Sequence, residues 1–217
     1  MTRPNKTSLL ALAVLCGCAY QVEYQAEYVP NEAPEYVAQE QLLIVIPESE
    51  RGLVFEGAPI SETGEFTTLT VPMGSVLQEI SQQVFGSCFA FGVTVVDSLR
   101  SEPDYFFAIE PTLQDFNYSY TRVIDDLGNG EIETSIIPQV DIGLNIAAYD
   151  AAGARVMLHR YDSGMVSGES YVVTNRPEEY INRTLHAALH GLMMQAAEDI
   201  RPLLVGQCEI IDVSPDG

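Results

Sequence analysis

The chain has 217 residues, and 47% of them are hydrophobic, so it has the material for one folded domain rather than a disordered chain. Its formal net charge is −21, from 31 acidic and 10 basic residues, and Lys6 is its only lysine. Nucleic-acid binding and docking on anionic lipid both depend on Lys and Arg, so the composition argues against either kind of partner. We interpret the acidity as favouring solubility over a dedicated cationic partner.

The N-terminus has the composition of a secretory signal peptide. Arg3 and Lys6 precede an unbroken apolar run over residues 9–15, and no acidic residue lies among the first eight. Seven apolar residues are too few to span a bilayer, which needs about 20. Residues 1–17 are therefore predicted to be removed from the mature protein.

The apolar run ends at Leu15-Cys16-Gly17-Cys18, which resembles the lipobox of bacterial lipoproteins. The resemblance implies that Cys18 takes the diacylglyceryl group, is cleaved to become the new N-terminus, and carries palmitate or a similar chain. Cys16 fails as the acceptor because the bulky Leu15 precedes it. Ala19, where an Asp would retain a lipoprotein at the inner membrane, implies an anchor in the outer membrane that faces the periplasm. The alternative is an ordinary secreted protein cleaved near Ala19.

Residues 18–40 are predicted to be the acylated N-terminus and a flexible tether. The segment is rich in Glu and Gln, contains two prolines and lacks leucine and isoleucine. Tyr20, Tyr24 and Tyr28 would share one face of a helix, and together with Tyr36 they could serve as aromatic anchors for a partner. We favour the plain spacer.

Residues 41–217 are predicted to form a single domain. A buried strand over 41–47 and a loop or hairpin over 51–66 lead to a second strand segment over 66–72. A helix is expected over 76–85, because Ser75 and Gln78 match a capping box and Gly86 is a natural stop. The strand over 91–98 follows.

The longest strand is expected over 104–124. The apolar residues change parity within it, which predicts a β-bulge near Gln114-Asp115. Asn129-Gly130 predicts a hairpin turn, and the return strand over 138–150 alternates cleanly between apolar and polar residues. A further strand begins at residue 154.

The final helix is expected to begin at Asn175 to Pro177 and to end at Pro202. Its apolar positions form one stripe: Ile181, Leu185, Leu189, Leu192, Ala196 and Ile200. We expect Leu185, Leu189 and Leu192 to pack on Ile142, Leu144 and Ile146 of the return strand. The predicted fold is α+β, a mainly antiparallel sheet with two amphipathic helices on one face in the order β-α-β-β-β-α.

The sequence offers no convincing catalytic or metal site. His186 and His190 are four residues apart on the last helix, but "HAALH" lacks the Glu of zinc proteases, so we interpret them as polar or semi-buried residues on the helix flank. The loop that begins at Asp125 resembles a calcium loop but fails at Leu127 and Ile136, and a hairpin explains it better. We therefore expect no enzyme activity, no cofactor and no metal.

Two cysteines remain in the predicted domain. Cys88 and Cys208 each follow the end of a predicted helix, and an even number of thiols in an oxidising compartment suggests a disulfide. We predict a Cys88–Cys208 bond, with two buried free thiols as the alternative. The apolar neighbours of Cys88 raise a thiol pKa and argue against a nucleophile.

The signal peptide, the lipobox and this order of elements, with "GSVLQEISQQVF" and "NRTLHAALHGLM" in the helices, resemble small Gram-negative envelope lipoproteins. YajG-like outer-membrane lipoproteins are the most similar, and lipopolysaccharide-assembly lipoprotein E and the auxiliary lipoproteins of ABC transporters share the broad outline. The resemblance implies a non-catalytic accessory or scaffold component of an envelope assembly or transport system, with a protein partner in the envelope. The alternative is a lipoprotein that binds a lipid or small apolar ligand between sheet and helices.

Overall fold

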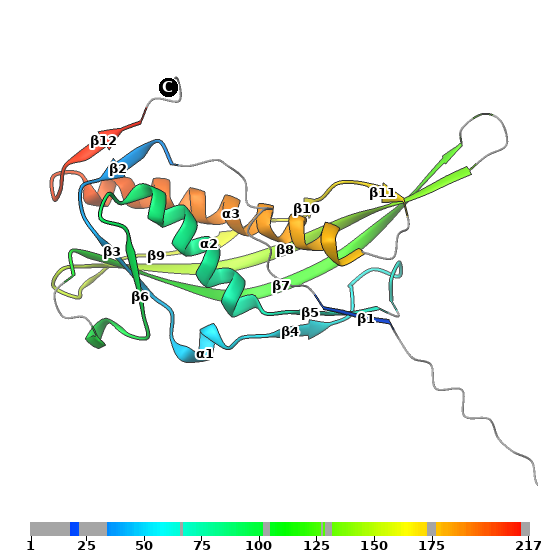
Figure 1. Ribbon diagram of the computed structural model, residues 1–217, viewed down its shortest axis with the longest axis horizontal. Helices are drawn as coiled ribbons and strands as arrows, with labels where there is room; N and C mark the ends of the chain where they lie inside the picture. The colour runs from blue at the N-terminus through cyan, green and yellow to red at the C-terminus, as the bar shows by residue number, and fades with distance from the viewer. Residues whose placement is uncertain are drawn as a thin grey trace, which may run out of the picture.

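A computed structural model describes residues 18–21, 34–65, 67–101, 105–126, 128, 132–172 and 177–213 (Figure 1). The helices are α1 (Glu48–Arg51), α2 (Met73–Cys88) and α3 (Pro177–Leu204), with a 3-10 turn at Leu99–Ser101. The strands are β1 (Cys18–Gln21), β2 (Tyr36–Ala38), β3 (Leu42–Val45), β4 (Phe55–Gly57), β5 (Thr67–Val71), β6 (Val93–Val96), β7 (Phe107–Asp126), β8 (Ile132–Asp150), β9 (Arg155–Asp162), β10 (Val166–Ser167), β11 (Tyr171–Val172) and β12 (Ile210–Asp212).

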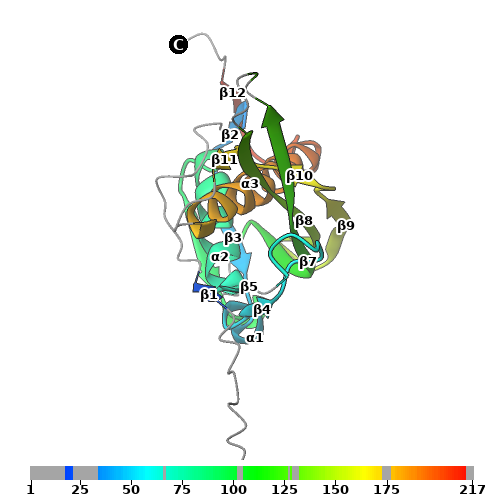
Figure 2. The ribbon, with the colours of Figure 1, turned by 90° about the vertical axis from the view of Figure 1, so that its right-hand side faces the viewer.

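A seven-stranded sheet forms the centre of the molecule. Its order is β10-β8-β7-β3-β6, and β9 and β11 also pair with β8. The β7–β8, β8–β9, β8–β10 and β8–β11 pairs are antiparallel, whereas β3 runs parallel to both β6 and β7. Helices α2 and α3 lie on the same face of this sheet (Figures 1 and 2). The predicted α+β class is confirmed.

The bulge predicted in the long strand is confirmed. The β7–β8 register shifts between Leu113 and Asp115, so that Leu113 pairs with Leu144 and Phe116 with Ile142. The extra residue keeps Leu113 and Phe116 on the helix side although their sequence parity differs. Gly143 is required opposite the bulge, because a Cβ there would lie 2.8 Å from the Asp115 carboxylate oxygens.

The core lies between the sheet and the two long helices. Ile142, Leu144 and Ile146 of β8 and Leu185, Leu189 and Leu192 of α3 are all at most 1% exposed and belong to one cluster. Strand alternation on β8 and the helical stripe on α3 therefore meet as predicted.

Both long helices extend beyond their predicted ends. Helix α2 begins at Met73 after Pro72, so Ser75 lies inside it and the predicted capping box is wrong. The backbone N–H of Gly74 donates instead to the carbonyl of Leu53 at 2.9 Å, which replaces a side-chain cap. Gly86 does not end α2, and Pro202 lies inside the last turn of α3, where the hydrogen bond it removes is tolerated.

The predicted tether is not a plain spacer over its whole length. Strand β2 pairs with β12, and Tyr36 and Ala38 are fully buried. The Tyr36 hydroxyl donates to the carbonyl of Ala197 in α3 at 2.7 Å. Strand β1 adds in parallel to β5, in a small sheet of order β1-β5-β4. Tyr24 and Tyr28 lie outside the described residues, as does the signal peptide over 1–17.

The β7–β8 pairing extends as far as Asp126 and Ile132, which confirms a hairpin. The turn residues Asn129 and Gly130 lie outside the described residues. The far part of this hairpin projects past the helices at one end of the molecule (Figure 1).

Candidate functional site

Cys18, the residue predicted to be acylated, is the first residue of β1. Its backbone stands opposite Thr67 of β5, and the register continues to Gln21 opposite Thr70. The chain enters β1 at the same end of the long axis as the projecting hairpin (Figure 1). Cys16 and Gly17, which complete the motif, lie outside the described residues.

The predicted Cys88–Cys208 disulfide is not formed: both residues are free thiols. The chain before β6 and the chain before β12 lie on opposite edges of the β2 segment. The Ala38 carbonyl accepts from the N–H of Ala90, and the Gln39 N–H donates to the carbonyl of Glu209. Because this carbonyl and N–H belong to one peptide unit, they point to opposite sides. Neighbouring strands are about 4.8 Å apart, so segments on the two edges are roughly 10 Å apart, beyond the ~7 Å limit for a disulfide.

Each thiol instead lies against its own helix. The Cys88 sulfur is 3.3 Å from the carbonyl oxygen of Val84, and burial raises the pKa of Cys88 to about 12. Burial also raises the pKa of Cys208, and the nearby Glu40 carboxylate adds to this shift. A thiol with a raised pKa carries little thiolate, so Cys88 is suited to packing rather than to nucleophilic chemistry.

His186 and His190 are buried in α3 rather than placed on its flank. Both are at most 2% exposed, and they continue the helical stripe that includes Met193, whose sulfur lies 3.8 Å from the hydroxyl of Ser81 in α2. Burial lowers the pKa of His186 to about 4, which keeps the imidazole neutral at physiological pH. Among the described residues, no group of three or more His, Cys, Asp or Glu is arranged to hold a metal ion.

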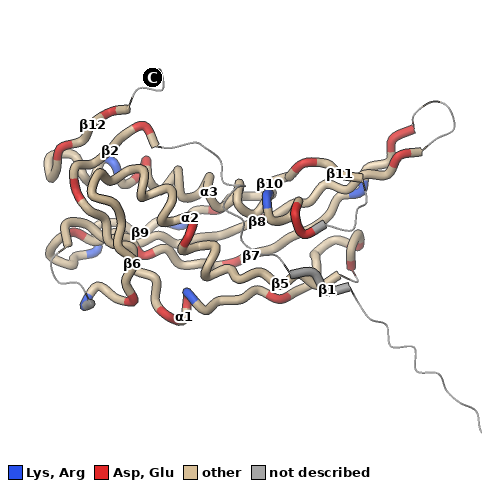
Figure 3. The backbone as a smooth tube through the Cα atoms, in the orientation of Figure 1, with Lys and Arg blue, Asp and Glu red and all other residues tan. Residues whose placement is uncertain are grey.

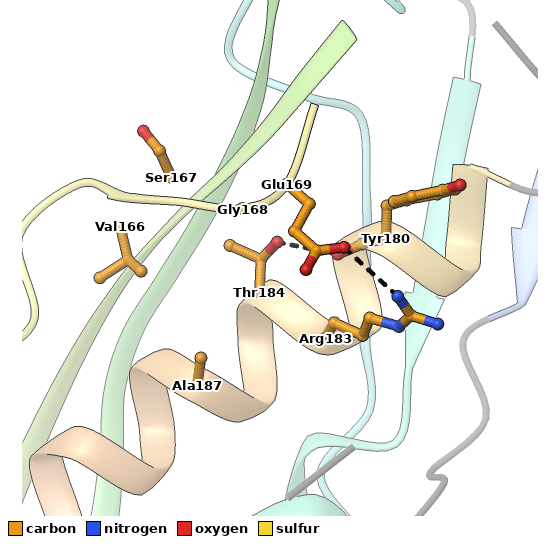
Figure 4. A pocket seen from close by; sticks show the side chains of 8 residues that line it. All are labelled: Val166, Ser167, Gly168, Glu169, Tyr180, Arg183, Thr184 and Ala187. Carbon is orange, nitrogen blue, oxygen red and sulfur yellow. Dashed lines mark hydrogen bonds and ion pairs between the residues drawn. The ribbon is translucent and has the colours of Figure 1, made fainter. Parts of the chain in front are cut away.

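One pocket in the described chain was not found from the sequence. It has a volume of about 570 Å³ and lies between the β10–β11 segment and the first half of α3 (Figure 4). Val166, Ser167, Gly168 and Glu169 line one side, and Tyr180, Arg183, Thr184 and Ala187 line the other. These residues all fall between 166 and 187, but they carry no motif that would have joined the two sides.

Glycine permits the two sides of this pocket to approach. A Cβ on Gly168 would lie 2.0 Å from the Thr184 hydroxyl oxygen and 3.0 Å from a ring carbon of Pro138. The Thr184 hydroxyl in turn donates to the carbonyl of Tyr180, one turn earlier in α3. The β10–β11 segment therefore lies directly on the helix at this point.

The pocket lining includes one cation, one carboxylate and one aromatic ring. The Arg183 guanidinium lies 3.4 Å from a Glu169 carboxylate oxygen and 5.8 Å from the centre of the Tyr180 ring. Tyr180 stacks on Tyr171 at 4.2 Å between ring centres. An exposed ion pair of this kind contributes little to folding stability.

A second pocket of about 430 Å³ lies between β9 and the second half of α3. The Tyr161 hydroxyl donates there to Asp199 at 2.9 Å, and its pKa is raised by burial and by that carboxylate. His159 lies beside Tyr161, with ring centres 4.6 Å apart. It belongs to β9, whereas His186 and His190 belong to α3.

No protein-family model matches the chain, and no curated protein matches it. Among solved structures, a protein described as a neuraminyllactose-binding hemagglutinin homolog from Helicobacter pylori is similar with a TM-score of 0.38 and 12% identity, over 79% of this chain and 91% of that one. A lipoprotein from Caulobacter crescentus CB15 gives 0.36 and 15%, over 61% and 83%. A minor lipoprotein from Acinetobacter baumannii gives 0.28 and 11%, over 81% and 98%. Similarity this low assigns neither a family nor a function to the chain.

Proposed function

We propose that the protein is a lipid-anchored lipoprotein of the bacterial envelope, held in the outer membrane by Cys18 and facing the periplasm. The observation that carries this proposal is the motif Leu15-Cys16-Gly17-Cys18 after a basic start and a short apolar run. Several acyl chains on one residue anchor a protein stably, whereas one chain does not. None of the described helices is long and apolar enough to cross a membrane.

The role proposed for the anchored body is non-catalytic, as an accessory or scaffold component of an envelope assembly or transport system. A core of closely packed apolar residues joins the sheet to α2 and α3, which makes the body rigid. Cys88 and His186 have chemically reactive side chains, and both are buried. Burial raises the pKa of Cys88 and lowers the pKa of His186, so the thiol and the imidazole stay neutral at physiological pH. These features support a docking body rather than an enzyme.

The anchor is tested by metabolic labelling with radioactive palmitate. Cys18→Ser is expected to abolish labelling and to leave an unprocessed or soluble protein, while Cys16→Ser is the matched control and should label as the unaltered chain does. Continued labelling of the Cys18→Ser protein would show that the lipobox assignment is wrong.

The accessory role is tested by crosslinking in cells, followed by mass spectrometry of the material that the anchored protein captures. A scaffold should give one reproducible envelope protein, and Cys18→Ser should lose it through loss of the membrane position. Organic extraction of the purified protein tests the alternative of a lipid carrier. Two results together would contradict the accessory role: stoichiometric lipid released from the Cys18→Ser protein, and no protein captured by the unaltered, anchored chain.

A further inference from the structure

The far part of the β7–β8 hairpin, residues 121–126 and 132–137, projects from the body as a two-stranded ribbon, here called the distal hairpin (Figures 1 and 2). Among the described strands, only the two-residue β11 pairs with it, through Ser135 and Ile136. An isolated two-stranded ribbon is at best marginally stable in water. A contact with something outside the chain would stabilise it.

The distal hairpin exposes two large apolar side chains on one face. Ile124 is 60% exposed and Ile132 is 69% exposed. Ile124 stands opposite Thr134, and Ile132 stands opposite Asp126, so the two isoleucines are diagonal neighbours on the same face of the ribbon. Their exposure has no explanation in the packing of the described chain.

The proposed anchor lies at the same end of the molecule as this ribbon. Cys18 stands opposite Thr67, which directly follows a loop that bonds to β7: the N–H of Ile60 donates to the carbonyl of Tyr118, and the N–H of Tyr120 donates to the Ser61 hydroxyl. From Tyr120 to Asp126, β7 extends roughly 20 Å further at about 3.3 Å per residue. Figure 1 shows β1 and the hairpin at one end of the long axis.

Among the described residues, no linker separates the proposed anchor Cys18 from the small sheet that contains β1. Because Cys18 is itself the first residue of β1, an acyl group on it would hold β5 and the loop before it close to the bilayer. A body held this way has one end toward the lipid, and the distal hairpin is on that end. The hairpin therefore reaches the bilayer when the body tilts toward it.

We propose that the distal hairpin lies on the membrane that holds the acylated Cys18, with Ile124 and Ile132 at the boundary between headgroups and acyl chains. This rests on the lipid anchor proposed above. The anchor supplies the affinity, because two exposed isoleucines alone bury little apolar area. The second contact fixes the orientation, so that the opposite end, with β6 and β12, points into the periplasm.

Charge selects the kind of lipid surface. Asp126 stands opposite Ile132 on the same face, and Asp125 and Glu133 pair on the other face, against the single cation Arg122 among the described residues of the distal hairpin. Acidic residues are also spread over the rest of the body (Figure 3). Such a ribbon is repelled by anionic lipid and tolerated by a zwitterionic surface such as phosphatidylethanolamine.

The experiment uses the absence of tryptophan from the sequence. Ile132→Trp introduces a single tryptophan on the distal hairpin, and Ile124→Trp is a second variant in case the first disturbs the strand. Phe91→Trp is the matched control, because Phe91 is 68% exposed and precedes β6 at the opposite end (Figure 1). Each acylated protein is reconstituted on vesicles of phosphatidylethanolamine and brominated phosphatidylcholine, whose bromines quench nearby tryptophan.

The expected result is a loss of emission and a blue shift for both hairpin variants, with unchanged emission for Phe91→Trp. Replacing half of the zwitterionic lipid by phosphatidylglycerol should reduce the loss. Vesicle flotation is measured first: a protein that does not float refutes the lipid anchor itself. A protein that floats but shows no quenching at either hairpin position refutes this inference alone. Crosslinking in cells that places a protein partner on the distal hairpin would also refute it.

Discussion

Tyr36 offers the sharpest test of where the folded body begins. The sequence placed it in a tether, whereas its side chain is fully buried, bonds to Ala197 in α3 and lies 5.6 Å from the Arg201 guanidinium. Replacing a buried aromatic side chain by Ala costs about 3–5 kcal/mol, a large part of a total stability of roughly 5–15 kcal/mol. Removing only the hydroxyl costs about 0.5–1.5 kcal/mol.

Urea unfolding followed by circular dichroism measures both losses, with Cys18→Ser as the soluble parent. With a slope of about 2 kcal/mol per molar urea, Tyr36→Ala should lower the midpoint by roughly 1.5–2.5 M, and Tyr36→Phe by about 0.5 M. Val37→Ala is the matched control, since Val37 is only half-buried on the same strand and should shift the midpoint little. If Tyr36→Ala shifted it no more than Val37→Ala does, residues 34–40 would be a tether after all.

Three further predictions concern the core and its titratable groups. Leu189→Ala should cost about 2–5 kcal/mol in urea unfolding, whereas Leu158→Ala, at a side chain 56% exposed on β9, should cost less than about 0.5 kcal/mol. Thiol labelling of the native protein should modify Cys208 and leave Cys88 unreacted. Denaturation without a reductant should make both thiols react with the label. A disulfide-linked species would contradict the separation of the two cysteines across β2. Because burial lowers the pKa of His186 to about 4, the unfolded chain binds a proton that the folded one does not between pH 6.5 and 4, so stability should fall by ~3 kcal/mol over that range and fall less in His186→Leu.

The parts of the fold that were predictable are those set by local periodicity. The parity change around Gln114-Asp115 and the stripe through Leu185 and Leu189 are visible in the sequence, because each follows from the geometry of a single strand or helix. The pairing of the α3 stripe with the β8 face also follows, because each exposes an apolar face that must be covered. The core between β8 and α3 was therefore predictable to the residue.

The errors arose where a distant segment decides a local outcome. Ser75 has the sequence of a helix cap, but the carbonyl of Leu53 reaches the N–H of Gly74 and lets α2 begin earlier. The pocket beside Arg183 depends on Gly168, between β10 and β11, lying against Thr184 of α3. Composition did not reveal either contact, since neither is encoded by neighbouring residues.

The N-terminal segment combines a local sequence pattern with contacts to distant segments. Its Glu- and Gln-rich composition is typical of a spacer, yet Tyr36 and Ala38 alternate inward as residues of a strand, and Cys18 begins another. A long flexible tether would allow an anchored body any orientation and would leave the distal hairpin without a defined neighbour. A strand that begins at the anchored residue removes that freedom, because the loop beside Thr67 and the β7 strand it contacts must then face the bilayer. If Cys18 is acylated, the same few backbone hydrogen bonds that join β1 to β5 determine which end of the molecule faces a partner in the periplasm.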